Sequence, residues 1–270
     1  MALETKGVEF GYGRKRVLED FDLEINPGEF VGLIGPNGSG KSTVIKLLSH
    51  VITPQHGEVR FGGRDVSRIP RRELAQLVSV VPQIPLLPSA FTAFEIVLMG
   101  RNPHLGLFQH EGTREFEVAM RAMERTGTEH LARRRINELS GGEIQSLLIA
   151  RALAQETAAM LLDEPTANLD IGRQAETLEM VTSLCHENKI AVLAALHDLN
   201  LAAQYCDRLY LIRDGRIRAT GKPAEVITES NIAAVYGATG CVYSHPANGL
   251  PMVLLDGSRR RGSRPGGGEH

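Results

Sequence analysis

The sequence is poor in the residues that hold many small or secreted proteins together. Its 270 residues include no tryptophan and only three cysteines, and aromatic residues make up 5%. Cys185, Cys206 and Cys241 are odd in number and widely spaced, which argues against a disulfide framework or a cysteine-rich metal cluster. We therefore expect a reducing compartment, with each thiol packed in apolar surroundings.

An excess of charge of one sign is missing as well. Lys and Arg number 30 against 32 Asp and Glu, which gives a formal net charge of -2. No overall basic field is present to attract nucleic acid or acidic lipid. Nucleic acid is therefore not an expected partner, and any bound anion must be held by local groups.

Long hydrophobic runs are also lacking. The segment Met1–Lys6 has no apolar core of a secretory signal. Leu74–Phe94 has no charged residue, but its three prolines and two glutamines make it unsuited to lipid. We therefore expect no membrane-spanning segment and a cytosolic protein.

Short apolar runs alternate with longer amphipathic stretches, which is typical of a parallel sheet covered by helices. The predicted strands of this sheet are 30–34, 78–81, 158–162 and 190–196. Alternating runs before residue 30 and at 57–61 indicate an antiparallel layer. Asp214-Gly215 supplies the two positive-φ residues of a type I′ turn, so a hairpin is expected there. The predicted fold class is α/β, with a mixed sheet and an antiparallel β subdomain.

The pattern becomes mainly helical between about residues 84 and 138. Thr92 and Glu95 have the spacing of a capping box, and Thr113–Arg125 is charged and amphipathic. We interpret this region as a helical insertion subdomain within one domain that covers residues 1–256. Residues 257–270 are rich in glycine and arginine without apolar periodicity, which predicts a disordered tail.

One segment carries the pattern G-x-x-x-x-G-K-[ST] between a predicted strand and a predicted helix. Its members are Gly35, Pro36, Asn37, Gly38, Ser39, Gly40, Lys41, Ser42 and Thr43. The glycines let backbone N–H groups curl around phosphate, and the helix N-terminus adds its positive dipole end. Lys41 would reach the β- and γ-phosphates, and Ser42 would present its hydroxyl to Mg²⁺. The pattern predicts a P-loop NTPase.

Two carboxylates end the predicted strand 158–162. Asp163 is placed to hold Mg²⁺ through its water shell, as a P-loop requires. Glu164 is the candidate general base or water-orienting group, since neighbouring side chains point apart where a strand ends. Beside a P-loop, this role is favoured over a simple turn before Pro165.

A third motif narrows the class of P-loop protein. Ser140 and Glu143 have capping-box spacing at the start of an amphipathic helix, and Gly141 and Gly142 leave its N-terminus open to an anion. Together with Leu139 they read LSGGE, which resembles the signature of the ATP-binding cassette (ABC) family. This resemblance implies an ABC ATPase fold in which two copies face head to tail. Each signature, here Ser140, Gly141, Gly142 and Glu143, would then contact the ATP held by the partner's P-loop.

The same resemblance assigns further roles, in order along 8–221. It implies that Tyr12 stacks on adenine, that Gln83 lies near Mg²⁺ and the attacking water, and that His197 lies near the γ-phosphate. Residues 167–170 would form the segment called the D-loop in this family, which ends at Asp170. The implied catalytic set is Glu164, His197 and Gln83, and the implied ligands of the Mg²⁺ that accompanies ATP are Ser42, Gln83 and Asp163.

Two details qualify the resemblance. Gln145 is followed by Ser146 where the family often has arginine, so one charged contact is expected to be absent without loss of hydrolysis. Asn188-Lys189 is not followed by the Asp of a guanine-specificity motif, which argues against a GTPase.

The segments 92–104 and 166–171 resemble those of subunits that serve importers of iron–siderophore, haem and cobalamin. This implies a homodimer beneath permease subunits, peripheral on the cytoplasmic face of the plasma membrane, with a binding protein that delivers the solute. The insertion would grip the permease. An exporter cassette and a soluble, non-transport ABC ATPase remain alternatives, whereas a non-hydrolysing module is disfavoured because Glu164 and His197 are present. The transported solute cannot be named from this chain.

Overall fold

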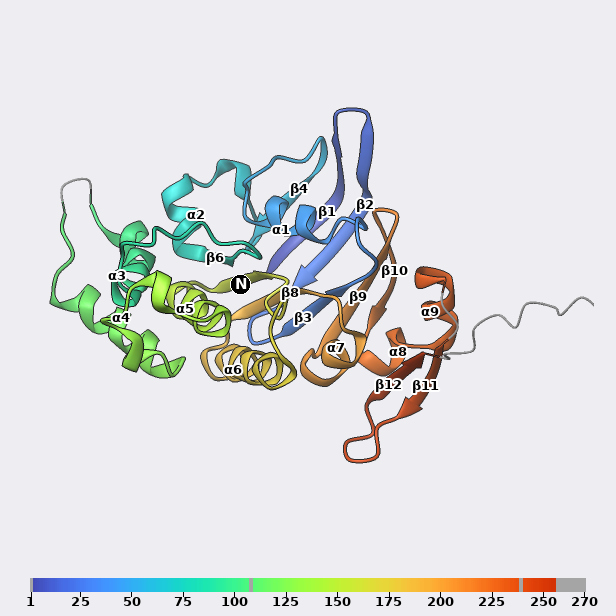
Figure 1. Ribbon diagram of the computed structural model, residues 1–270. Coiled ribbons are helices and arrows are strands. Elements are labelled where there is room, and N and C mark those ends of the chain that lie inside the picture. Colours follow the sequence, from blue (N-terminus) through green and yellow to red (C-terminus); the bar gives the residue numbers. More distant parts are fainter. Residues whose placement is uncertain (1, 107–108, 238–239, 256–270) are drawn as a thin grey trace, which may run out of the picture.

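The computed structural model describes residues 2–106, 109–237 and 240–255 (Figure 1). The tail predicted at 257–270 lies outside these residues. Among the described residues, no helix has the length and apolar character needed to cross a bilayer. The uncharged segment Leu74–Phe94 is divided between the end of one helix, a buried strand and the start of another helix.

A six-stranded mixed sheet forms the centre of the molecule. Its strand order is β10-β9-β3-β8-β7-β6, and only the edge strand β10 runs antiparallel to its neighbour. The strands are β3 (Phe30–Ile34), β6 (Val78–Val81), β7 (Ala159–Asp163), β8 (Ala191–Leu196), β9 (Arg208–Arg213) and β10 (Arg216–Gly221). The predicted mixed sheet is confirmed. So is the hairpin, because Asp214 and Gly215 join β9 to β10 with φ of 51° and 73°.

Helices and a second sheet cover both faces of the central strands, which explains their unbroken apolar sequence. Every residue of β3 and β8 is buried. Within β3, a Cβ on Gly32 would lie 2.6 Å from Leu209 Cδ2 and 2.7 Å from Cys206 Sγ. Only glycine therefore lets the neighbouring segments approach β3 so closely.

The predicted antiparallel layer is a four-stranded sheet in the order β2-β1-β4-β5. Its strands are β1 (Leu3–Tyr12), β2 (Lys15–Ile25), β4 (His56–Phe61) and β5 (Arg64–Asp65). Helix α1 (Lys41–Leu48) shares one core with this sheet and with one face of the mixed sheet, and the short helices η1 (Val66–Arg68) and α2 (Arg71–Leu77) follow β5 (Figure 1).

The opposite face of the mixed sheet is covered by helices. These are α5 (Gly141–Ala154), α6 (Ile171–Asn188), α7 (Leu199–Tyr205), α8 (Pro223–Val226) and α9 (Glu229–Tyr236), followed by the hairpin β11 (Gly240–Ser244) and β12 (Pro251–Leu255). Cys185 and Cys206 are buried in this layer, and burial raises the pKa of both thiols, that of Cys185 to about 12. The prediction of burial is wrong for Cys241, which is only half-buried because it lies on the outlying hairpin.

The helical region between β6 and α5 has its own hydrophobic core, which also includes one side of α5. It contains α3 (Ala93–Leu98), η2 (Met99–His104), α4 (Thr113–Arg125), η3 (Glu129–Leu131) and η4 (Ile136–Glu138). The capping box at the start of α3 is present, with Thr92 and Glu95 each bonded to the other's backbone N–H. The division into one domain over 1–256 with an insertion over 84–138 stays a prediction.

The segment Gly100–His104 anchors this helical region to the rest of the chain. Arg101 is 1% exposed, and its guanidinium donates to the Ala154 carbonyl (2.6 Å) and to Glu156 Oε2 (2.8 Å). A Cβ on Gly100 would lie 2.3 Å from the Arg151 carbonyl oxygen. The run that carried part of the family resemblance thus packs against the end of α5.

Arg101→Ala is expected to destabilise the protein by about 2–4 kcal/mol, because it leaves a cavity in the core and an unpaired Ala154 carbonyl at the end of α5. Urea unfolding measures the change. Arg68→Ala is the control: Arg68 is 87% exposed, and its removal should change stability by less than about 0.5 kcal/mol. Equal stability of the two variants would contradict the anchoring role.

Candidate nucleotide-binding site

The predicted chemical groups follow the carboxyl ends of four adjacent parallel strands. The P-loop, residues 35–43, follows β3, and Gln83 follows β6. Asp163 and Glu164 lie at the end of β7, and His197 comes directly after β8. The register pairs Ile34 with Leu196, Asp163 with Ala195 and Val81 with Leu162, so these ends are level. Ligands of open α/β sheets collect at this edge.

The P-loop wraps around the amine of its own lysine. Lys41 Nζ donates to the carbonyl oxygens of Gly35 (2.8 Å) and Pro36 (3.2 Å). Burial lowers the pKa of Lys41, while the nearby carboxylates of Glu164 and Asp163 oppose that shift. The ammonium is therefore held by weak, neutral acceptors that a phosphate would outcompete.

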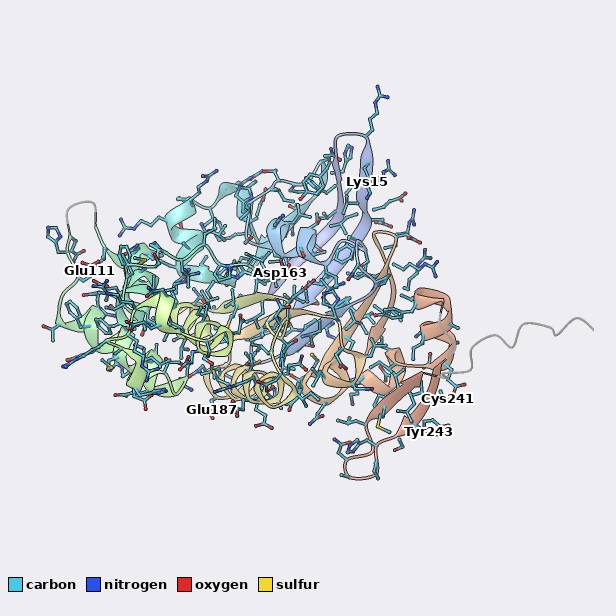
Figure 2. All side chains as sticks on the ribbon, in the orientation of Figure 1. Lys15, Glu111, Asp163, Glu187, Cys241 and Tyr243 are labelled. Carbon is cyan, nitrogen blue, oxygen red and sulfur yellow. The ribbon has the colours of Figure 1, made fainter. Side chains whose placement is uncertain are left out.

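Ser42 and Asp163 meet across the sheet edge. Ser42 Oγ donates to Asp163 Oδ1 at 2.9 Å. Burial raises the pKa of Asp163, and the Ser42 hydrogen bond partly offsets that rise. Asp163 lies near the middle of the molecule, where Figure 2 labels it.

Glu164 is the meeting point of the proposed catalytic groups. Gln83 Nε2 donates to Glu164 Oε2, and His197 Nε2 contacts Glu164 Oε1. Its backbone is left-handed, with φ of 53°, an uncommon conformation for a side chain of this kind. This backbone turn lets Asp163 and Glu164, adjacent in sequence, meet different partners.

A cavity of about 440 Å³ brings most of the predicted residues together. Its lining is Tyr12, Lys15, Val17, Asn37, Gly38, Gly40, Lys41, Ser42, Thr43, Gln83, Glu164 and His197. Tyr12 is 49% exposed, and its ring lies at 87° to that of Phe10 with a centroid distance of 4.9 Å. An aromatic ring exposed to this degree at a cavity can stack on a planar ligand. Lys15, the first residue of β2, also lines this cavity, although the sequence analysis did not predict it as a site residue (Figure 2). A single lysine beside a turn forms no recognisable motif.

The signature residues do not line this cavity. Ser140 caps α5, with Glu143 N–H donating to Ser140 Oγ (3.3 Å) and Ser140 N–H donating to Glu143 Oε2 (2.7 Å). Asp170 likewise caps α6 by accepting the Arg173 N–H (2.9 Å). A Cβ on Gly142 would lie 3.4 Å from Arg173 Cδ, so the Arg173 side chain passes close to the start of α5. Within one chain, then, the P-loop and the signature form two separate surfaces.

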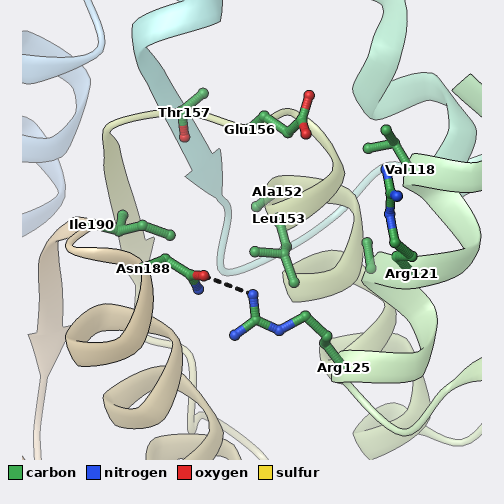
Figure 3. Close-up of a pocket in the computed structure, with 10 residues that line it drawn as sticks. Val118, Arg121, Arg125, Ala152, Leu153, Glu156, Thr157, Asn188 and Ile190 are labelled. Carbon is green, nitrogen blue, oxygen red and sulfur yellow. Dashed lines mark hydrogen bonds between the residues drawn. The ribbon is translucent and has the colours of Figure 1, made fainter. Parts of the chain in front are cut away.

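A second cavity, of about 360 Å³, lies where α4, α5 and the end of α6 meet (Figure 3). Arg125 spans it, donating to Asn188 Oδ1 (2.7 Å) and Glu187 Oε2 (2.8 Å). None of the predicted site residues lines this cavity. It belongs to the boundary between the helical region and the sheet layers, and the P-loop cavity is the better candidate for chemistry.

The donor set at the P-loop fits magnesium. Ser42 and Asp163 present hydroxyl and carboxylate oxygens close together, and Gln83 lines the same cavity as Ser42. Mg²⁺ prefers oxygen ligands and usually binds through one or two protein groups together with substrate phosphates. In the described part of the chain, no cluster of three or more His, Cys, Asp or Glu could hold a metal without such phosphates.

Relatives of this chain carry names from one functional group. It is 40% identical to the ferric enterobactin transport ATP-binding protein of Escherichia coli, with 93% of each covered. It is 43% identical to the hemin import ATP-binding protein of Gloeobacter violaceus, over 95% of this chain and 94% of the relative. It is also 41% identical to the cobalamin import ATP-binding protein of Halobacterium salinarum, over 94% of this chain, but it spans only 63% of that protein's length.

Solved structures agree on the fold. A metal-chelate type ABC transporter in an inward-facing conformation superposes with a TM-score of 0.83 at 27% identity, over 94% of this chain and 97% of that one. A dimeric bacterial ABC transporter cassette superposes with a TM-score of 0.72 at 28% identity, over 82% and 98%. The predicted α/β fold is therefore confirmed. Residues 18–167 match the sequence pattern that defines the ABC transporter family. This match and the identity to the relatives above show that the chain belongs to the ABC transporter family.

Proposed function

We propose that this chain is the ATP-hydrolysing subunit of an importer for a metal chelate of the iron–siderophore, haem or cobalamin class. The observation that carries the proposal is the convergence of Lys41, Glu164 and His197 on one cavity. The names of the relatives support the transport role and the class of solute.

ATP binding follows from the P-loop geometry. The Lys41 ammonium leaves the Gly35 and Pro36 carbonyls for the β- and γ-phosphates, a charge-assisted interaction in place of neutral ones. Backbone N–H groups at the start of α1 face the phosphates, and Tyr12 offers its ring to the adenine. Ser42, Asp163 and Gln83 would hold Mg²⁺, and the bound ion would neutralise phosphate charge.

Hydrolysis is assigned to Glu164. Its carboxylate accepts a proton from the attacking water or orients that water towards the γ-phosphate. The contacts with Gln83 and His197 hold both carboxylate oxygens, so the base is oriented before ATP arrives. Once ATP is bound, His197 would turn to the γ-phosphate and Gln83 to the attacking water, which frees the Glu164 carboxylate to accept the proton.

A second copy of this chain completes the site. The open N-terminus of α5, with Ser140 and Gly142, supplies a phosphate-binding surface that this chain's own cavity does not use. Head-to-tail pairing of two copies would place it, with Asp170 nearby, over the partner's ATP. A relative of known structure is dimeric.

The helical region is the proposed docking surface for permease subunits. A cavity of about 580 Å³ there is lined by Phe94, Leu98, Phe116 and Met120, and the Phe94 and Phe116 rings stack at 5.7 Å. Phe116 is 44% exposed. An apolar groove of this kind fits a short amphipathic helix of a partner. The chain would then act as a peripheral subunit on the cytoplasmic face of the plasma membrane, with a binding protein delivering the solute.

Phe116→Asp is expected to weaken assembly with the permease by at least about 30-fold, because it places a charge in an apolar contact. ATP affinity of the isolated chain should stay within twofold. Co-purification of the tagged chain with its membrane subunits measures assembly. Val51→Asp is the matched control: Val51 is 71% exposed and lies outside the helical region. Normal assembly of Phe116→Asp would remove this docking surface from the proposal.

An uptake assay identifies the class of transported solute. Vesicles or cells that carry the transporter are offered labelled iron–siderophore, haem or cobalamin, and the Glu164→Gln variant, which is expected to hydrolyse ATP very slowly, is the control. ATP-dependent uptake of one class supports the proposal. ATP-dependent extrusion would instead favour an exporter, and ATPase activity without membrane partners would favour a soluble ABC ATPase.

A further inference from the structure

The P-loop cavity is lined by one lysine that the proposed reaction does not use, Lys15. This residue begins β2, directly after the β1–β2 turn, and it pairs in register with Tyr12 of β1 (Figure 2). Its side chain is exposed, and among the described residues its ammonium has no ion-pair partner. The ammonium is therefore available to an anion that enters the cavity.

Close packing at two glycines fixes the position of β2 beside the P-loop. A Cβ on Gly40, the last glycine of the P-loop, would lie 2.7 Å from Leu18 Cδ2 and 3.3 Å from the Val17 carbonyl oxygen. A Cβ on Gly215, in the β9–β10 turn, would lie 2.2 Å from the same carbonyl oxygen. The Glu19 N–H also donates to the Gly215 carbonyl (3.1 Å). This part of β2 therefore has little freedom to move away from the P-loop.

A bulge in β2 lies between this packed segment and Lys15. Phe10 pairs with Leu18 but Gly11 pairs with Arg16, so Val17 is an extra residue on β2. Bulges redirect neighbouring side chains and are common beside functional sites. Both Lys15 and Val17 line the cavity. The fold of the antiparallel sheet, rather than a free loop, thus sets where Lys15 begins.

The position of Lys15 along the cavity follows from these contacts. Val17 touches the P-loop at Gly40, and Lys15 lies two residues nearer to Tyr12, which is roughly 6–7 Å along a strand. The lysine ammonium is carried on a flexible four-carbon stem. It can therefore reach the space between the Tyr12 ring and the start of α1.

This space is where the middle of an ATP molecule would lie. Adenine stacked on Tyr12, with the β- and γ-phosphates at Lys41, leaves the ribose and the α-phosphate between these two residues. Of these two groups, only the α-phosphate is charged. Hydrogen bonds between an ammonium and a phosphate oxygen are shorter and about twice as strong as those between neutral groups. The α-phosphate is therefore the better partner for the ammonium of Lys15.

We propose that Lys15 is a further nucleotide-binding residue, whose ammonium donates to an α-phosphate oxygen of bound ATP. This inference rests on the proposed role of the P-loop cavity in ATP binding. The two lysines of the cavity then hold different parts of the nucleotide. Lys41 acts on the β- and γ-phosphates, whereas Lys15 acts on every adenine nucleotide that carries an α-phosphate.

Lys15→Gln removes this charge and keeps a side chain of similar polarity. It should raise the Kd of the full chain for Mg-ATP about 3- to 10-fold at low salt, the effect of losing one exposed charged contact. The Kd values for AMP and for 2′-deoxy-ATP should rise by the same factor, because both nucleotides keep the α-phosphate. Lys15→Arg, which keeps the charge, should recover most of the affinity. Displacement of a fluorescent ADP analogue measures all of these Kd values.

Salt provides a second measurement of the same contact. An interaction between exposed charges is strongly screened at an ionic strength of about 1 M, where the Debye length is about 3 Å. The difference in Kd between the natural chain and Lys15→Gln should therefore fall below about twofold at this ionic strength. A difference that does not change with salt would contradict a contact between charges.

Lys6→Gln is the matched control. Lys6 is an exposed lysine of β1 in the same sheet, 3.4 Å from Glu4 Oε1, and it does not line the cavity. Its Kd for Mg-ATP should stay within twofold of that of the natural chain. An unchanged Kd in Lys15→Gln, or an equal rise in Lys6→Gln, would overturn the role of Lys15.

The series of nucleotides separates the α-phosphate from its neighbours. A rise in Kd seen with ATP but absent with 2′-deoxy-ATP or 3′-deoxy-ATP would assign Lys15 to the ribose. A rise seen with ATP but absent with AMP would assign it to the β- or γ-phosphate. Either result would overturn the contact with the α-phosphate.

Failure of this inference is distinguishable from failure of the proposed function. If Lys41→Ala loses ATP while Lys15→Gln binds it normally, the P-loop proposal stands and only the role of Lys15 is wrong. If Lys41→Ala binds ATP as the natural chain does, the nucleotide site itself is wrongly assigned.

Discussion

Glu164→Gln is expected to bind ATP normally and to hydrolyse it about 100- to 10,000-fold more slowly, the usual effect of losing a general base. Glutamine keeps the size of the side chain and one oxygen that can accept the Gln83 or His197 contact. It cannot take a proton from water. ATP turnover of the intact transporter and ATP binding by the isolated chain measure the two effects separately.

The same variant tests the second half of the site. Because bound ATP persists, Glu164→Gln should form a stable dimer at saturating ATP, seen as a doubled mass in light scattering. Glu179→Gln, an exposed change on α6, is the control and should keep normal turnover. Near-normal turnover in Glu164→Gln would exclude Glu164 as the base, and an unchanged monomer mass would argue against the paired arrangement.

Lys41→Ala is expected to weaken ATP binding itself, by about 100-fold, because a charge-assisted bond to phosphate contributes about 1.5–3 kcal/mol. In the unliganded chain, the hydrogen bonds of the Lys41 ammonium go to two neutral carbonyls, and burial of the ammonium outweighs its attraction to the nearby carboxylates. Folding should therefore suffer little. Equilibrium titration with Mg-ATP and thermal unfolding distinguish the two effects.

Lys222→Ala provides the comparison, since Lys222 is exposed and precedes α8, away from the residues that line the P-loop cavity. It should bind ATP as the natural chain does. An Lys41→Ala chain that unfolds several degrees earlier would show that the lysine also holds the P-loop together. In that case, Lys41→Arg would restore stability without restoring full affinity, because the planar guanidinium does not replace a compact ammonium.

Local motifs were readable because each depends on neighbouring residues. The P-loop glycines, the Asp214-Gly215 turn and the Ser140–Glu143 capping box act over a few positions, so backbone rules predict them directly. The structural role of Arg101 could not be predicted in this way. The segment 92–104 that contains it supported the family resemblance, but its side chain is bonded to Ala154 and Glu156, which lie more than 50 positions away in the sequence.

Local patterns of residues were enough to assign the family, the α/β class and the separate parts of the nucleotide site, because phosphate binding requires particular residue types at fixed spacing. Which of these parts lie together became visible only in the folded chain. Parallel strand order brings Gln83 and His197 to the same carboxylate, that of Glu164. Packing of the antiparallel sheet adds Lys15 to the cavity lining, and the signature residues stay outside it. Such contacts depend on the packing of distant segments, which no local spacing encodes.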